Sequence, residues 1–155
     1  MRRADREITD LNIIKGILDD SKVIRITMFD EEYPYMVPLC FGYEITENGM
    51  DIYLHCAKEG MKLDLIKKNN HVSFEVDDFV RTQIMHYGIT ARYRSVVGSG
   101  DATILDSDED KRHGLQLILN QYGYLDYDLS NCKTFDFTTV IRIHVKELHG
   151  KKNVE

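Results

Sequence analysis

Two residues with reactive side chains lie close together where a strand pattern changes into a helix pattern. In the stretch 54–66, His55 stands at the end of the strand and Lys62 at the start of the helix, after a turn at Gly60. A helix N-terminus has unpaired N–H groups and a partial positive charge, so a lysine beside it makes a candidate phosphate site. His55 alone is more often a hydrogen-bonded structural histidine.

A second candidate anion site is Arg94 followed by Ser95, within a strand pattern over 93–105. A guanidinium and a hydroxyl can hold phosphate oxygens through charge-assisted hydrogen bonds. On a solvated strand the same residues would have no function. Gly98 and Gly100 lack the third glycine and the helix of a dinucleotide-binding loop, so we interpret them as bends in a long barrel strand.

The segment 33–43 is predicted to be a strand with two unlike faces. Bulky side chains alternate along one face, whereas Met36, Pro38, Cys40 and Gly42 share the other. Pro38 cannot donate a ladder hydrogen bond, which favours an edge or a bulge, and Gly42 leaves room for a close approach to the backbone. A flat ligand could lie along this face, and the alternative is an edge strand with a bulge and no ligand.

Hydrophobic periodicity and turn signals predict the remaining elements. Asn48-Gly49 marks a hairpin turn, and Tyr53 and His55 are expected to face away from the core side of their strand. The segment 77–92 has no clear period, which is typical of a loop or an irregular strand. The other expected elements are helices at 10–20 with Thr9 as N-cap, at 59–69, and at 108–121 with a capping box at Ser107 and an end at Gly123, and strands over 22–28, 50–56, 72–76 and 135–145.

Six or seven alternating strands with three helices do not follow a βαβα order. We therefore predict a mainly β fold, a small antiparallel barrel with peripheral helices. The chain of 155 residues has no linker or repeat and is expected to form one domain over 1–155. It has no apolar run long enough to span a membrane, and its start is charged, so a cytoplasmic protein is expected.

Composition argues against several functions. The net charge of −6 is opposite to the basic surfaces that bind nucleic acid. Cys40, Cys56 and Cys132 have neither disulfide nor zinc spacing, and the histidines are scattered, so no metal site is expected. Motifs of nucleophilic hydrolases are also missing from the sequence.

Three segments carry a family resemblance: Val37-Pro38-Leu39-Cys40-Phe41-Gly42-Tyr43, His55-Cys56-Ala57-Lys58-Glu59-Gly60-Met61-Lys62 and Ser95-Val96-Val97-Gly98-Ser99-Gly100-Asp101-Ala102. Together and in this order they resemble the Nim family of nitroimidazole-resistance proteins. The N-terminal run 2–8 and Gly150-Lys151 are also similar to that family, so the resemblance extends over nearly the whole chain. Nim proteins have the flavin-binding split-barrel fold of the pyridoxamine phosphate oxidases.

The resemblance implies an antiparallel, Greek-key split barrel that forms a homodimer with FMN between the subunits. It implies that Lys62 and the pair Arg94-Ser95 hold the FMN phosphate. It also implies that the backbone of Val37, Pro38 and Leu39 runs along the isoalloxazine ring, and that the residue near the flavin and the substrate is His55. The chain lacks the C-terminal substrate-binding segment of the true pyridoxamine phosphate oxidases, so vitamin synthesis is not expected.

The implied activity is that of an FMN-dependent oxidoreductase. A reductant such as NAD(P)H would reduce the flavin, and hydride would pass to a nitroimidazole or another small electron-poor acceptor. One alternative is a flavin- or haem-binding module without turnover that acts as a sensor or store. Another is a split-barrel interaction protein that has lost its cofactor.

Overall fold

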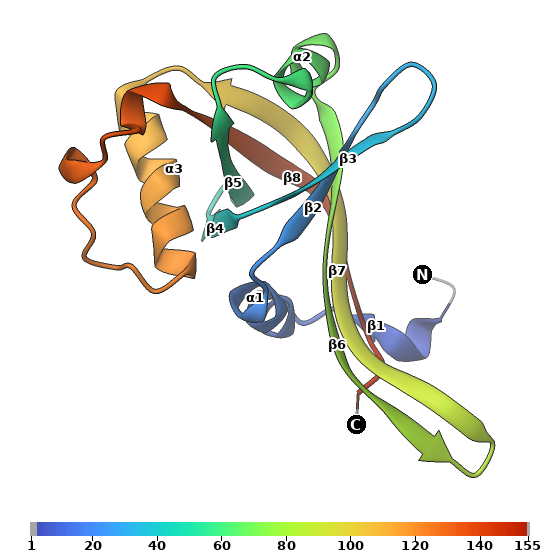
Figure 1. Ribbon diagram of the computed structural model, residues 1–155. Coiled ribbons are helices and arrows are strands. Elements are labelled where there is room, and N and C mark those ends of the chain that lie inside the picture. The colour runs from blue at the N-terminus through green and yellow to red at the C-terminus, as the bar shows by residue number, and fades with distance from the viewer. Residues whose placement is uncertain (1–2, 155) are drawn as a thin grey trace.

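The computed structural model describes residues 3–154, so Arg2, which belongs to the N-terminal similarity, and Glu155 lie outside the described residues. Within that range the chain forms eight strands and three α-helices (Figure 1). The helices are α1 (Leu11–Asp20), α2 (Met61–Lys68) and α3 (Asp108–Gln121). The strands are β1 (Glu7–Ile8), β2 (Ile24–Met28), β3 (Tyr35–Leu39), β4 (Phe41–Thr46), β5 (Gly49–Ala57), β6 (His71–Met85), β7 (Gly88–Leu105) and β8 (Thr138–Lys152).

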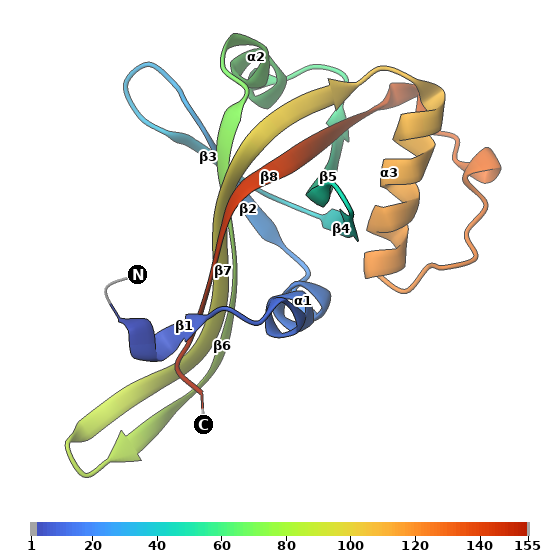
Figure 2. The ribbon, with the colours of Figure 1, turned by 180° about the vertical axis from the view of Figure 1, so that it is seen from behind.

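The eight strands belong to one sheet, in which every pair is antiparallel. The strand order is β3-β2-β6-β7-β8-β5-β4, and β1 pairs with β8. The long strands β6, β7 and β8 curve strongly, so the sheet wraps around its own interior (Figures 1 and 2). The predicted mainly β, antiparallel fold with peripheral helices is confirmed.

The apolar side chains gather in two clusters. The larger fills the inside of the curved sheet, where Phe41 and Phe74 are almost fully buried. The smaller lies between the outer side of the sheet and α3, and it includes Tyr53, which is only 4% exposed. The sequence correctly places Tyr53 away from the main core, but the residue is buried all the same because α3 covers it.

The caps of the helices explain where they begin. Asp10, rather than the predicted Thr9, caps α1, and its carboxylate accepts the Asn12 N–H at 2.8 Å. The predicted capping box of α3 forms: the Ser107 hydroxyl accepts the Asp110 N–H at 3.1 Å and donates to the Asp110 carboxylate at 2.7 Å.

The single strand predicted over 33–43 is wrong, because the chain breaks into β3 and β4 at Cys40. β3 pairs with β2 at one margin of the sheet and β4 pairs with β5 at the other, so the chain changes partners at this residue. Pro38 lies in an edge strand, as predicted. A Cβ at Gly42 would overlap the backbone of Leu117, so the group that closely approaches this glycine is α3.

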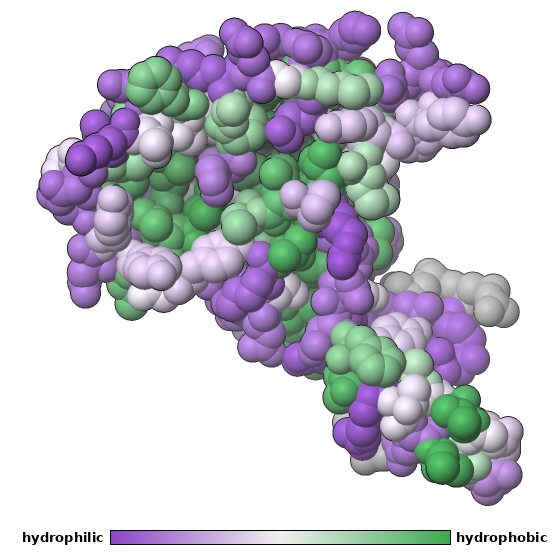
Figure 3. Space-filling view, in the orientation of Figure 1, coloured by the Kyte–Doolittle hydropathy of each residue, from purple (hydrophilic) through white to green (hydrophobic). Residues whose placement is uncertain are grey.

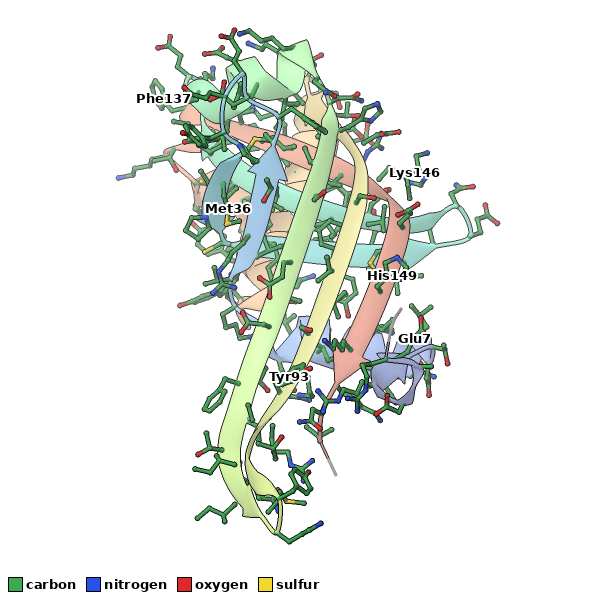
Figure 4. The ribbon with its side chains drawn as sticks, turned by 90° about the vertical axis from the view of Figure 1, so that its right-hand side faces the viewer. Glu7, Met36, Tyr93, Phe137, Lys146 and His149 are labelled. Atoms are coloured by element: carbon green, nitrogen blue, oxygen red, sulfur yellow. The ribbon has the colours of Figure 1, made fainter. Side chains whose placement is uncertain are left out.

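The segment 77–92 is a regular hairpin, so the loop alternative is wrong. β6 and β7 stay paired as far as Met85 and Gly88, with one register shift between Phe79 and Arg81. The hairpin projects from the body of the molecule, and we call residues 79–93 the arm (Figures 1 and 4). β8 also differs from its prediction: it begins at Thr138, after a 3₁₀ turn, and continues to Lys152.

Candidate functional site

The free edge of β3 forms the first part of the candidate site. Since β3 is the last strand at its margin, the backbone groups on its free side have no partner strand among the described residues. Met36 points outward and is 58% exposed, and Pro38 beside it is also exposed, whereas Val37 and Leu39 pack partly against the core. The segment therefore offers a ligand its backbone and few bulky side chains, as the predicted contact with a flat ring requires.

The N-terminus of α2 is the second part. Gly60 occupies the N-cap with a φ of +141°, and no side chain caps the helix, in contrast to α1 and α3. The first intrahelical bond runs from the Leu63 N–H to the Gly60 carbonyl at 2.9 Å, so the N–H groups of Met61 and Lys62 precede it. Together with the half-buried Lys62 side chain, these groups fit a phosphate.

Cys56, near the end of β5, is close enough to the start of α2 for its thiol to be affected by the charge of Lys62. Burial raises the pKa of the Cys56 thiol, and the Lys62 ammonium acts in the opposite direction. The Lys62 charge therefore acts at the end of β5, close to the strand position of His55.

His55 lies at the mouth of a cavity of about 220 Å³ on the outer side of β5. Partial burial lowers the pKa of His55, so the imidazole is neutral at pH 7. The remaining cavity wall comes from α3, from the segment that follows it and from the start of β8, and its residues are Leu115, Ile118, Leu119, Tyr127, Leu129, Cys132, Thr134 and Thr138.

Cys40 connects the β3 edge with the surroundings of His55. β4 pairs with β5 from Phe41 opposite Leu54, so Cys40 and His55 each lie one residue beyond this pair. Burial, together with a hydrogen bond to Cys40, raises the pKa of Tyr122, the residue at the C-terminus of α3. The β3 edge and the His55 cavity are therefore neighbouring parts of one outer surface.

Arg94 and Ser95 are not brought together as a joint anion site. Adjacent residues of a strand point to opposite faces of the sheet. The Arg94 guanidinium binds two carboxylates of its own chain, Asp78 at 2.6 Å and Asp20 at 3.1 Å. Their assignment to the phosphate stays a prediction, and the arrangement within one chain gives it less support than it gives Lys62.

A polar network beneath α3 was not foreseen from the sequence. The Tyr53 hydroxyl donates to the Glu44 carboxylate at 2.6 Å, and His113 Nε2 lies 2.9 Å from the same oxygen. The rings of Tyr53 and His113 meet edge-on at 5.6 Å. This network ties α3 to β4 and β5, and so it positions one wall of the His55 cavity.

The cavity residues Tyr127, Leu129 and Cys132 were also missed. They belong to an irregular segment without hydrophobic period, so the sequence pattern contains no signal that they would fold over His55. Their position depends on where α3 ends.

These features belong to a known class of fold. The family model described as Pyridoxamine 5'-phosphate oxidase matches residues 12–152, and the chain is therefore a member of that family. The resemblance to its split barrels, including the Nim proteins, is confirmed. No curated protein matches the chain significantly.

Several solved structures share the fold. A candidate 5-nitroimidazole antibiotic resistance protein from Bacteroides thetaiotaomicron is 26% identical with a TM-score of 0.83, covering 94% of this chain and 86% of that one. A flavocytochrome from Azotobacter vinelandii is 17% identical with a TM-score of 0.81 (100% and 72% covered). An FAD-binding protein from Mesorhizobium loti is 20% identical with a TM-score of 0.67 (96% and 98% covered). Among residues 3–154, no helix is long and apolar enough to cross a membrane.

Proposed function

We propose that this protein is a homodimeric, cytoplasmic FMN-dependent oxidoreductase that reduces small, uncharged, electron-poor acceptors of the nitroimidazole type, with a reductant such as NAD(P)H. The observation that carries the proposal is that the open β3 edge ends at Cys40, next to the part of β5 where His55 lines a cavity, and that β5 leads directly to an uncapped helix start with Lys62. Membership of a flavin-associated fold class supports it, as does the similarity to the Bacteroides protein.

The residues of the site divide the task of holding the cofactor. The free backbone groups along Val37, Pro38 and Leu39 would hydrogen bond to the polar edge of the isoalloxazine ring. Lys62 and the first N–H groups of α2 would bind the phosphate, with Arg94 and Ser95 as further candidates. When bound, FMN supplies the redox chemistry that amino-acid side chains lack.

The cavity beside His55 favours a particular kind of acceptor. Apart from the neutral His55, its lining consists of apolar, hydroxyl and thiol side chains. Since no lysine or arginine among residues 3–154 lines it, the cavity offers no charged partner for the phosphate of pyridoxamine 5'-phosphate. A neutral imidazole at its mouth can orient an uncharged ring and donate or accept a proton there.

The first experiment is to purify the protein and record its visible spectrum, and then to release the flavin and identify it by chromatography. FMN, rather than FAD, is expected. Reduction of a nitroimidazole is then measured under anaerobic conditions with excess reductant. Flavin-loaded protein that reduces no acceptor would leave the flavin- or haem-binding module as the better hypothesis, and protein that stays colourless after incubation with FMN would contradict the whole proposal.

Two variants separate cofactor binding from turnover. Lys62→Ala should weaken FMN binding about tenfold, because it removes a charge-assisted contact to the phosphate. Lys67→Ala, on the exposed side of the same helix, is the matched control and should bind FMN normally. His55→Ala should keep FMN but lower turnover about 100-fold. Equal FMN binding by the two lysine variants would remove Lys62 from the site.

A further inference from the structure

Lys111, near the start of α3, is buried to an unusual degree for a charged residue. It is only 9% exposed, and it is the only lysine, arginine, aspartate or glutamate among residues 3–154 that lies in the interior. Lysine is almost never fully buried unless its charge is paired, because a buried ammonium loses its hydration. Lys111 therefore needs a partner that balances this loss.

The chain itself supplies no such partner. Among residues 3–154, no oxygen atom accepts a hydrogen bond from Lys111 Nζ and no carboxylate forms an ion pair with it. Nζ instead lies 4.5 Å from the centroid of the Phe135 ring, which attracts a cation but cannot replace its hydrogen bonds. Nζ is also not sealed inside the protein, since the only fully buried, unpartnered side-chain nitrogen in this part of the chain is Arg142 Nε. One side of the ammonium therefore stays open.

Lys111 opens into a cavity of about 310 Å³ at one corner of the sheet, which we call the Lys111 cavity. Its other lining residues are Lys58, Ile104, Leu105, Asp106, Thr138 and Thr139. The ends of three strands meet here, because β5 pairs with β8 as far as Ala57 opposite Thr138, and β7 pairs with β8 as far as Leu105 opposite Val140. Figures 1 and 2 both show the end of β7, the start of β8 and the first turn of α3 close together.

The lining of the Lys111 cavity favours an anion. Lys58 and Lys111 provide two positive charges and Asp106 provides one negative charge, whereas the whole chain has a net charge of −6. An ammonium group has three hydrogen-bond donors and no acceptor, so it requires acceptor atoms from a ligand. Because Asp106 also lines the cavity, a ligand with one negative charge is favoured over a ligand with two.

The size and surroundings of the cavity favour a small ligand. A volume of about 310 Å³ is near the lower end of the range of about 300–1,000 Å³ for ligand pockets. Ile104 and Leu105 add apolar surface to the lining. The upper margin of the molecule, where α3 begins and α2 follows β5, carries mainly hydrophilic side chains (Figure 3), which does not favour a protein partner there.

The Lys111 cavity adjoins the His55 cavity but is distinct from it. Thr138 lines both cavities, and its hydroxyl donates to the Thr134 carbonyl at 2.8 Å, so this hydroxyl is not free to donate to a ligand in either. Lys58 and Lys111 line only the Lys111 cavity, and neither is assigned to the flavin or to its acceptor.

We propose that the Lys111 cavity binds a small organic carboxylate with a short apolar body. The carboxylate accepts hydrogen bonds from the ammonium groups of Lys111 and Lys58, and the apolar part lies against Ile104 and Leu105. The bound carboxylate supplies the partner that the buried ammonium lacks within its own chain. This inference stands on the cavity alone and does not depend on the proposed function.

The test is isothermal titration calorimetry of the purified protein with propionate and, separately, with inorganic phosphate. Propionate should bind with a dissociation constant of about 1 mM or less, and phosphate more weakly. Lys111→Met keeps the apolar stem without the charge and should weaken propionate binding at least about tenfold. Arg112→Met is the matched control: it removes a second cation over the same Phe135 ring, at 4.3 Å, but outside the cavity lining, and should bind propionate normally. Far-UV circular dichroism checks that both variants fold.

Two further variants change the charge of the lining without touching the buried lysine. Lys58→Met removes an exposed lysine and should weaken propionate binding less than Lys111→Met does. Asp106→Asn removes the negative charge and should tighten the binding of both propionate and phosphate.

Thermal unfolding gives a readout that a purely structural lysine would not produce. Without a carboxylate, Lys111→Met should unfold at a higher temperature than the wild type, because the unpaired buried charge is gone. Propionate should raise the unfolding temperature of the wild type but not of this variant. A wild type that shows neither binding heat nor a temperature shift with propionate would overturn the proposal, and so would equal binding by Lys111→Met or tighter binding of phosphate than of propionate. Since these readouts need neither flavin nor an acceptor, failure of the proposed function would leave them unchanged.

Discussion

The sheet has one outward region that its own chain covers and another that the chain leaves open. At the covered end, α3 lies over β4 and β5, and its own Leu115 and Ile118 are buried against the sheet together with Tyr53. At the open end, Ile84 and Ile89 face solvent on the arm. Both regions belong to the same continuous sheet, so the difference lies in whether a later segment of the chain folds back.

The covered and open ends differ in the free energy that their apolar side chains contribute to folding. A fully buried large apolar side chain contributes about 1.5–3 kcal/mol relative to an exposed one. Tyr53 and Ile118 make this contribution within one chain, whereas Ile84 and Ile89 can make it only when something covers the arm. The covered end should therefore have the same stability at every protein concentration, and the open end should not.

The largest effect is expected where α3 touches the sheet most closely. Gly42→Val would force a side chain into the Leu117 backbone, which cannot move without shifting the whole helix. We expect the free energy of unfolding to fall by about 3 kcal/mol, measured by urea denaturation.

Gly16→Ala is the control for this variant, because we expect it to raise the free energy of unfolding rather than lower it. Nothing lies within 4 Å of a Cβ at this helical glycine, so alanine should stabilise α1 by up to about 1 kcal/mol. If Gly42→Val were as stable as the wild type, the close packing of α3 on β4 would be contradicted.

A smaller effect is expected from the polar network at the covered end. Burial acts to raise the pKa of the Glu44 carboxyl, but the hydrogen bonds with Tyr53 and His113 prevail and hold that pKa below its ordinary value of 4.5. Because the folded state lowers the pKa of this carboxyl group, the group stabilises the fold at any pH above its ordinary pKa. This stabilisation is lost as the pH falls through the pKa of the folded state. Glu44→Gln should therefore cost about 1.5 kcal/mol at pH 7, and progressively less below pH 4.5.

Urea denaturation at several pH values checks this dependence. Glu47→Gln changes an exposed carboxylate in the adjoining hairpin turn and should have little effect at any pH. A cost for Glu44→Gln that did not change with pH would show that the lowered carboxyl pKa does not contribute.

The covered and open ends also differ in how far the sequence could predict them. The positions of α1, α2 and α3 follow from hydrophobic periodicity, which is a local signal, and the start of α3 also follows from its capping box. The turn at Asn48-Gly49 is marked by a local signal as well. The break at Cys40 has no local signal, because it depends on which strands lie at the two margins of the sheet. The arm has no period because neither of its faces is buried in the core of the chain, so its fold does not require apolar and polar side chains to alternate.

The residues of the candidate site also differ in whether the sequence could predict their positions. Lys62 and His55 could be placed from the change of strand to helix near Gly60, and the structure puts both at that junction. For Arg94, the sequence could not reveal that Asp20, far away in the chain, would bind its guanidinium. Cavity residues such as Leu129 were not predictable because their segment is ordered by α3 rather than by a pattern of its own.

The smallest expected effect compares the two ends directly through hydrogen exchange. The amides of the arm between Thr82 and Ala91 should become at least about tenfold less protected on dilution below the dimer dissociation constant, which corresponds to about 1.4 kcal/mol. The amides of α3 should keep the same protection, because the cover over Tyr53 belongs to the same chain. Mass spectrometry of peptides from both regions in one sample supplies the internal control. Arm amides that exchange at the same rate at every concentration would mean that a second copy contributes nothing to the stability of the ribbon.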